Sequence, residues 1–203
     1  MIGRIDLLVA AVAGYLIGSI PTAYLVGRLA AGIDVRVEGE GNVGARNTFH
    51  VVGKRWGIAV FAADFLKGLV VAALFLGQSD AVLAAGTTAA LVGHCFPVWL
   101  RFVGGKGLST VGGSTVAIMP AAALAGTAAA GVVWLVSKRF LPTTVAAIVV
   151  TIVAAPLLGA SLFEVGLVVW LFALTGVKRA IDEPRMRAIE ARTGWDRLDG
   201  LGS

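Results

Sequence analysis

Charged residues are scarce in this sequence, whereas apolar residues are abundant. Of the 203 residues, 14% are charged and 58% are hydrophobic, which is more apolar material than a soluble core of this size requires. This balance is typical of a polytopic membrane protein. The net charge of +5 does not indicate a nucleic-acid-binding protein, because the basic residues lie between apolar runs and form no single basic face.

Cysteine and histidine are almost absent. The single Cys95 excludes an intramolecular disulfide. Neither histidine, His50 or His94, is followed four or five residues later by the aspartate that many acyltransferases place there. A G-x-S-x-G elbow and a Walker P-loop are missing as well, and possible metal ligands are few and scattered. The sequence therefore favours binding of phosphate over a protein nucleophile, and we expect neither a metal nor a cofactor.

Long apolar runs fill most of the chain and predict membrane-spanning helices. Five such runs lie at 5–31, 56–76, 81–100, 143–158 and 162–177. Pro21 is expected to kink or break the first helix, and the run continues past it without the cleavage site of a signal peptide. Residues 108–136 are too many for one ordinary span, and Pro120 predicts a hairpin of two short or tilted helices there. The charged tail from Lys178 onward is expected to be helical or loose at the surface.

The distribution of Lys and Arg assigns an orientation to these helices. With seven spans and an outside N-terminus, 16 of the 17 basic residues lie on the cytoplasmic side, and Arg4 is the exception. A single span at 108–136 would instead place Lys138 and Arg139 outside, against the positive-inside rule. We therefore predict an all-α polytopic protein of the cell inner membrane. It has about seven transmembrane helices, a cytoplasmic C-terminus and a single domain over residues 1–203.

Two polar, glycine-rich segments interrupt the apolar runs. Residues 36–54 read RVEGEGNVGARNTFHVVGK, and residues 101–107 read RFVGGKG. Glycines let the backbone approach a ligand closely, successive amide groups form concave anion sites, and Arg and Lys add positive charge. On one side of a membrane, these two segments predict a phosphate-binding pocket.

Several polar residues of these regions have a structural alternative to ligand binding. Asp64 and Lys67 share one face of the second span, where Lys67 belongs either to a structural ion pair or to the anion site. Lys106 is interpreted as a phosphate ligand, with a membrane-surface anchor as the alternative. Asn42 and Asn47 either contact substrate or bond the loop backbone.

Two further polar residues also have a structural alternative to ligand binding. His94 is either a buried, hydrogen-bonded residue or part of the site, and Arg36 either serves topology alone or binds an anion. The arginines of the tail are expected to form a solvated or lipid-facing basic surface; they are Arg185, Arg187, Arg192 and Arg197.

Three motifs in these segments resemble those of the bacterial acyl-phosphate:glycerol-3-phosphate acyltransferase family (PlsY). The second motif corresponds to Asp64-Phe-Leu-Lys-Gly68, and the third to Gly93-His-x-Phe-Pro-Val98 with Gly104-Gly-Lys-Gly107. The motifs follow the family's order and have family-like separations across residues 18–110. The first motif is similar to Gly18-Ser-Ile-Pro21, Gly32-x-Asp-x-Arg36, Gly39-x-Gly-Asn-Val-Gly-Ala45, Asn47 and Gly53-Lys54.

The resemblance implies a seven-helix enzyme of the inner membrane that uses no cofactor. It would move an acyl group from acyl-phosphate to the 1-hydroxyl of glycerol 3-phosphate, which gives lysophosphatidate for phospholipid synthesis. Its partners would be these two substrates and the lipid bilayer, and a substrate phosphate, with no protein base, would take the proton. Such an enzyme mainly positions two anionic substrates and offsets charge in the transition state. The implied substrate-binding residues are Arg36, Gly41, Asn42, Gly44, Asn47, Lys67, His94, Gly104, Gly105, Lys106 and Gly107.

Three positions of the first motif depart from the family pattern. The family's serine is replaced by Glu40, a threonine by Arg46, and a phosphate-binding arginine by His50. A carboxylate among phosphate ligands repels the substrate unless it is paired, so we expect Arg46 to pair with Glu40. The family's C-terminal motif is not recognisable in residues 178–192.

Three functions are consistent with this sequence. The first is acyl transfer to glycerol 3-phosphate or a related phosphorylated polyol. The second is the same chemistry in a paralogue with a changed acceptor or donor, which the three departures would explain. The third is a non-catalytic protein that conducts anions or binds lipid on the same scaffold. No oligomeric state is predicted.

Overall fold

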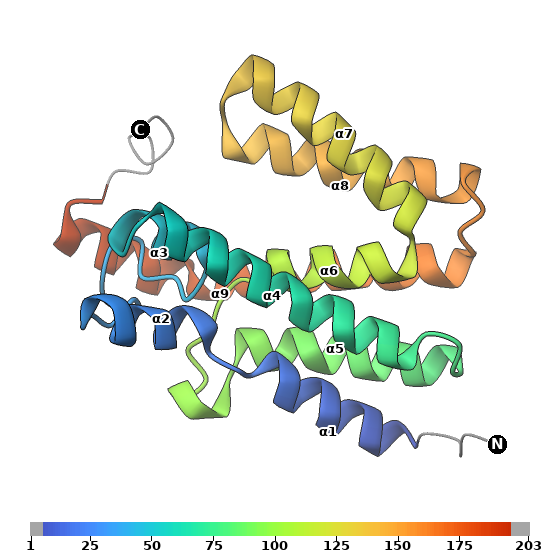
Figure 1. Ribbon diagram of the computed structural model, residues 1–203, viewed down its shortest axis with the longest axis horizontal. Helices are drawn as coiled ribbons and strands as arrows, with labels where there is room; N and C mark the ends of the chain where they lie inside the picture. Colours follow the sequence, from blue (N-terminus) through green and yellow to red (C-terminus); the bar gives the residue numbers. More distant parts are fainter. Residues whose placement is uncertain (1–5, 196–203) are drawn as a thin grey trace.

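Helices make up all of the regular structure in residues 6–195, the part of the chain that the computed structural model describes (Figure 1). The all-α prediction is therefore confirmed. The α-helices are α1 (Leu7–Gly18), α2 (Thr22–Ala31), α3 (Ala45–Val51), α4 (Lys54–Phe75), α5 (Asp80–Cys95), α6 (Leu108–Ile118), α7 (Pro120–Ser137), α8 (Phe140–Leu157) and α9 (Leu162–Thr193). A short 3₁₀ turn, η1 (Val98–Leu100), follows α5.

Five segments are long and apolar enough to cross a membrane. They are Leu7–Ala31, Lys54–Phe75, Asp80–Leu100, Pro120–Ser137 and Phe140–Leu157. One shorter apolar helix, α6, adds to them. The first half of α9, up to Val177, corresponds to the seventh predicted span and holds Glu164 as its one charged residue. The 11 residues of α6 rise only about 16 Å, so this helix covers about half of the apolar core of a bilayer.

Prolines set several of the helix boundaries. The first apolar run breaks at Ser19–Pro21 into α1 and α2, as predicted. The predicted hairpin at 108–136 is two helices that meet at Met119, with Pro120 at the start of α7. The third apolar run, predicted as one span to residue 100, leaves the α-helix at Cys95, because the residue before Pro97 is biased away from helical geometry.

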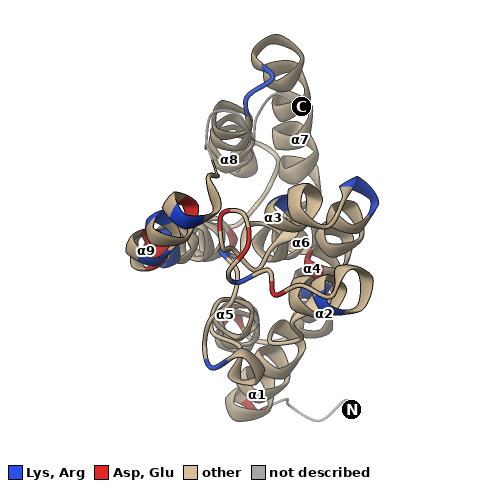
Figure 2. Ribbon diagram, turned by 90° about the vertical axis from the view of Figure 1, so that its left-hand side faces the viewer, with Lys and Arg blue, Asp and Glu red and all other residues tan. Residues whose placement is uncertain are grey.

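Consecutive long helices run in alternating directions (Figure 1). The polar segment between α2 and α4, the segment after α5, the α7–α8 turn and the C-terminal end of α9 therefore lie at one end of the molecule. Lys and Arg residues, blue in the ribbon, gather at this end, which Figure 2 views face on. The helix directions thus match the seven-span arrangement that the charge count predicts.

Glycines bring three pairs of helices into close contact. A Cβ atom on Gly14 would collide with the carbonyl of Gly86, which brings the α1 and α5 backbones together. Gly68 of α4 lies equally close to the Thr110 carbonyl of α6, and Gly126 packs on α8. Small residues at helix contacts are the usual means of packing helices in a membrane.

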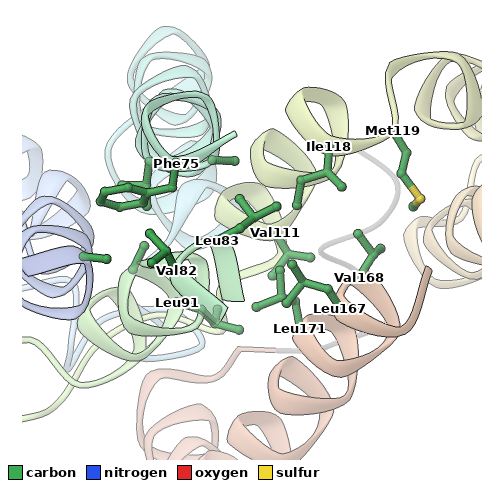
Figure 3. Packing of buried hydrophobic residues seen from close by; sticks show 14 of the residues in the cluster. Phe75, Val82, Leu83, Leu91, Val111, Ile118, Met119, Leu167, Val168 and Leu171 are labelled. Carbon is green, nitrogen blue, oxygen red and sulfur yellow. The ribbon is translucent and has the colours of Figure 1, made fainter. Parts of the chain in front are cut away.

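The main apolar core lies where α4, α5, α6 and α9 meet (Figure 3). It includes Phe75, Leu91, Val111 and Leu171, each at most 3% exposed. The α7–α8 pair packs mainly on itself and joins this core through Ala122 and Ala155. The core therefore fixes α4, α5, α6 and α9 relative to one another, and their ends carry the polar segments.

The last helix extends well beyond the span predicted for it. A capping box of Ser161 and Glu164 begins α9, which then continues for 32 residues without interruption. Its length of about 48 Å exceeds the roughly 30 Å of a bilayer core. The charged tail is therefore helical as far as Thr193, and its polar turns pack against the first glycine-rich segment.

Candidate functional site

The segment between α2 and α3, residues 32–44, has no regular secondary structure, and one asparagine organises it. The side chain of Asn47 is fully buried, and its Oδ1 accepts a hydrogen bond from the Glu40 amide at 3.1 Å. Its Nδ2 donates to three loop carbonyls at 2.9 to 3.0 Å, those of Val35, Glu38 and Asn42. These contacts support the backbone-bonding alternative for Asn47 over direct contact with substrate.

The carboxylate of Glu40 lies between two basic side chains. Its Oε2 is 3.5 Å from NH1 of Arg46 and 3.6 Å from Nζ of Lys106, and the Glu40 side chain is 4% exposed. The expected pair of Glu40 with Arg46 is therefore present, whereas the contact with Lys106 was not predicted. The two glycine-rich segments meet here, where two cations surround one anionic group.

The glycines around Lys106 bind this segment to the end of α5. The amides of Gly104 and Gly105 donate to the carbonyls of Cys95 and His94 at 3.1 Å each. Because these amides are already hydrogen-bonded, the predicted cradle of free glycine amides is not formed by this pair. Gly107, at φ +87°, begins α6. Lys106 is therefore the group of this segment that reaches the Glu40 carboxylate.

Burial lowers the pKa of two groups beside Glu40. The pKa of the Lys106 ammonium falls because burial disfavours its charge, while the Glu40 carboxylate opposes that shift. The pKa of His50 is lowered by burial first and by the nearby Arg46 cation second. His50 also meets the ring of Trp195 edge to face, with centroids 5.2 Å apart. The neutral imidazole is thus favoured where the family has a phosphate-binding arginine.

Asn42 presents a buried acceptor to the same region. Its Oδ1 has no hydrogen-bond partner within residues 6–195, and the residue is 6% exposed. A buried acceptor without a partner is uncommon and energetically unfavourable. The neighbouring glycines shape the loop: Gly41 adopts φ +69° and donates to the Glu38 carbonyl, and the carbonyl of Gly44 accepts from Thr48.

Arg36 is held at the rim of the loop. Its guanidinium forms a two-pronged contact with Asp34, with NH2 to Oδ2 at 2.7 Å and Nε to Oδ1 at 3.0 Å. Hydrogen bonds from Arg36 lower the pKa of Asp34, and Asp34 raises the pKa of Arg36. The guanidinium also lies 5.0 Å from the ring centre of Tyr24. This arrangement supports a structural role for Arg36, and contact with an anion stays a prediction.

A second group of polar residues lies among the helices, centred on Lys67. The ammonium donates to Asp64 Oδ1 at 2.6 Å, to Thr22 Oγ1 at 3.2 Å and to the carbonyl of Ile20. The break at Pro21 frees that carbonyl from the pattern of a continuous helix. Three acceptors match the three hydrogens of an ammonium group, so the structural ion-pair alternative is supported for Lys67.

His94 lies between this cluster and the second glycine-rich segment. Its Nδ1 is 3.7 Å from Asp64 Oδ1, and its ring leaves no room for a side chain at Gly105. A small cavity beside it is lined by Thr22, Asp64, Lys67 and His94 together with Ser19, Ile20, Pro21, Ala23, Val43 and Pro97. His94 is buried, as expected for a structural residue, and it also borders this cavity.

The tail prediction is wrong for Arg185, which is partly buried against the loop, whereas Arg192 is exposed as predicted and also contacts the loop. Arg185 NH1 donates to the carbonyl of Gly41 at 3.0 Å, and Arg192 NH2 donates to that of Val37 at 3.2 Å. Arg187 does lie on the surface, with 72% of its side chain exposed, and Arg197 lies outside the described residues. The buried residues of this part of α9 have the spacing of one helix face; they are Asp182, Met186, Ile189 and Glu190. That periodicity is the sequence signal that could have indicated a buried face in the tail.

Comparison with known proteins points to one family. The sequence model described as glycerol-3-phosphate acyltransferase matches residues 8–183. A glycerol-3-phosphate acyltransferase of Rubrobacter xylanophilus is 46% identical over 143 residues, which cover 70% of each chain. That of Myxococcus xanthus is 38% identical over 164 residues, covering 79% of this chain and 85% of the relative.

A solved structure extends the similarity to the whole fold. The crystal structure of PlsY (YgiH), an integral membrane glycerol 3-phosphate acyltransferase, in its glycerol 3-phosphate form superposes with a TM-score of 0.78 at 28% identity. The match covers 97% of this chain and 99% of that one. The lysophosphatidic acid form gives a TM-score of 0.75 over 90% and 92%. Fold, motif order and family match agree, and this chain belongs to the glycerol-3-phosphate acyltransferase family.

Proposed function

We propose that this protein transfers an acyl group from an acyl-phosphate to the 1-hydroxyl of glycerol 3-phosphate. In this reaction the acyl C–O bond to phosphate breaks, an ester C–O bond to glycerol forms, and the hydroxyl proton leaves with the phosphate. The products are lysophosphatidate and inorganic phosphate. The observation that carries the proposal is the pair of cations, Arg46 and Lys106, which surrounds an anionic group in a member of this family.

The contacts separate the proposed ligand-binding residues from those that support them. Lys106 and Arg46 supply positive charge for a substrate phosphate, which charge-assisted bonds hold more strongly than neutral ones. The unpartnered Oδ1 of Asn42 accepts from a substrate hydroxyl. Asn47 and Lys67 keep the loop and the helix break in place. His94 shapes the cavity wall, and a substrate phosphate serves as the proton acceptor.

The test is direct. Purified protein is incubated with palmitoyl-phosphate and isotopically labelled glycerol 3-phosphate, and the products are identified by mass. Labelled lysophosphatidate that depends on both substrates is expected, and a Lys106→Ala variant should produce much less. Binding of glycerol 3-phosphate without any turnover of acyl-phosphate would support the non-catalytic alternative instead.

Glu40 favours a second candidate, acyl transfer to a different acceptor. This carboxylate stands where the family has a serine, and it already neutralises part of the charge of Arg46 and Lys106. A less anionic acceptor would be repelled less by it. Competition among glycerol 3-phosphate, glycerol and other phosphorylated polyols in the same assay would identify such a preference.

The proposed site faces the cytoplasm of a bacterial cell, in one domain that spans residues 1–203. The supporting observation is that the basic residues gather on the end of the molecule that carries both glycine-rich segments (Figure 2). Single cysteines at the exposed positions Ser79, Lys138 and Arg187, in a Cys95→Ala background, test this orientation with an impermeant reagent. Labelling from outside is expected at position 79 alone. The orientation is wrong if positions 138 and 187 react and position 79 does not.

A further inference from the structure

The last turns of α9 hold the loop that carries Glu40 and Asn42. Arg185 NH1 bridges two loop carbonyls, that of Gly41 at 3.0 Å and that of Arg36 at 3.5 Å. Thr193 Oγ1 donates to the carbonyl of Gly39 at 2.8 Å. These side chains lie 144 to 154 residues later in the chain than their partners, so the contact is a product of tertiary structure alone.

The α9 contacts complement those of Asn47. The Asn47 side chain donates to the carbonyls of residues 35, 38 and 42. Three α9 side chains, those of Arg185, Arg192 and Thr193, donate to the carbonyls of residues 36, 37, 39 and 41. Together they hold every carbonyl from 35 to 42 except that of Glu40. A loop without regular hydrogen bonding of its own is thereby fixed from two sides, as its buried polar backbone requires.

Apolar contacts and charge add to this arrangement. The side chain of Ile189 packs so closely on Gly41 that no Cβ fits there, and Trp195 lies against Gly39. Arg185 is itself 3.8 Å from Asp182, which pairs with the buried Lys178. The Lys178 ammonium lies 4.9 Å from the ring centre of Phe96, two residues after His94. The same helix therefore contacts both the loop and the residue that follows α5.

We infer that residues 185–193 of α9 are a positioning element for the substrate loop, with Arg185 as its main residue. By fixing the loop carbonyls, Arg185 holds the Glu40 and Asn42 side chains where they face Lys106 and the substrate. It touches neither side chain and acts through the backbone. Preorganisation of this kind strengthens binding because less conformational freedom is lost when the ligand binds. The kinetic part of the inference rests on the proposed function.

Arg185→Ala in the full chain tests this role by two measurements. Hydrogen–deuterium exchange of the amides in residues 36–42 should become faster, because the loop opens more often. The KM for glycerol 3-phosphate should rise about tenfold, as expected for loss of a bond from a charged donor. We expect kcat to change less, since the reacting groups are untouched. Arg185→Lys keeps a donor that reaches one carbonyl, so its values should lie between those of the wild type and Arg185→Ala.

Arg187→Ala is the matched control. This arginine is two residues away on the exposed side of the helix, where it pairs with Glu183, and its loss should leave exchange and KM unchanged. The inference is overturned if folded Arg185→Ala shows wild-type exchange in residues 36–42 and wild-type KM. If Arg185→Ala does not fold, Arg192→Ala and Thr193→Val probe the neighbouring carbonyls by the same readouts. Absence of turnover in the wild type would reject the proposed function, while the exchange comparison would still decide the role of α9.

Discussion

Lys67 and Lys106 are both largely buried lysines, and each lies within 4 Å of a carboxylate. Their surroundings differ in one respect. The Lys67 ammonium donates to three acceptors, supplied by α4, by the break before α2 and by the first residue of α2. The Lys106 ammonium has Glu40 at 3.6 Å, which is longer than a hydrogen bond between nitrogen and oxygen.

This difference teaches how to separate a structural lysine from a ligand-binding one. Residue type and burial are similar at the two sites, so neither property distinguishes them. The number of protein acceptors around the ammonium does, because a saturated ammonium cannot add a phosphate oxygen without losing a bond. Lys67 is saturated by the fold, whereas Lys106 retains donors for a substrate.

The largest expected effect is on stability, from Lys67→Met. This change leaves the Asp64 carboxylate buried without its cation, and loss of one partner of a buried pair destabilises a protein by about 3–5 kcal/mol. Thermal unfolding in detergent should show a large fall in stability. Lys67→Met with Asp64→Leu removes both charges and should recover much of the loss. Equal instability of the single and double variants would contradict the ion-pair assignment.

Lys106→Ala should act on binding and spare the fold. Loss of a charge-assisted contact with phosphate is expected to weaken glycerol 3-phosphate affinity by about 1.5–3 kcal/mol. Isothermal titration on purified protein measures this change, and thermal unfolding close to that of the wild type serves as the control. Unchanged affinity in the variant would show that Lys106 does not bind the substrate phosphate. Lys106 would then be a structural lysine, as Lys67 is.

Glu40 is expected to have a smaller effect in the opposite direction. Glu40→Ser frees Arg46 and Lys106 from their carboxylate partner, so phosphate binding should tighten. The gain should be smaller than the loss in Lys106→Ala, because the contacts of Glu40, at 3.5 and 3.6 Å, are longer than a charge-assisted hydrogen bond. Glu40→Gln keeps the size of the side chain and removes only its charge, so it should tighten binding similarly. A gain with Ser alone would indicate relief of steric hindrance. Weaker binding in both variants would show that the carboxylate itself contacts the ligand.

The smallest expected effect is a pH dependence that originates at Lys106. Because burial lowers its pKa, the ammonium loses its proton at a lower pH than an exposed lysine does. Affinity for glycerol 3-phosphate should therefore be highest near neutral pH, where Lys106 is charged. It should decline as the pH rises toward the pKa of Lys106. Phosphate stays doubly charged over this range, since its second pKa is about 6. Lys106→Arg should remove the decline, because arginine keeps its charge, and an equal decline in that variant would assign the effect to another group.

The sequence by itself determined the class of protein and the order of its helices. Apolar runs and prolines placed the spans and their breaks, because a bilayer core and a missing amide each impose a local constraint. The spacing of Gly18–Pro21, Asp64–Gly68 and Gly104–Gly107 pointed to the family. Opposite charges at Glu40 and Arg46, six residues apart, predicted their pairing correctly.

The tertiary structure decided what each polar residue does. Sequence could not show that Lys67 is saturated, because one of its acceptors is the Ile20 carbonyl, 47 residues away. Sequence also could not show that Lys106 meets Glu40. It predicted a surface position for Arg185, which instead binds the carbonyl of Gly41, 144 residues earlier in the chain. Local patterns report hydrophobic periodicity and backbone preference, whereas the partners of a charged side chain depend on which helices pack together. In this protein the packing of α4, α5, α6 and α9 in the main core determines which charged side chains meet.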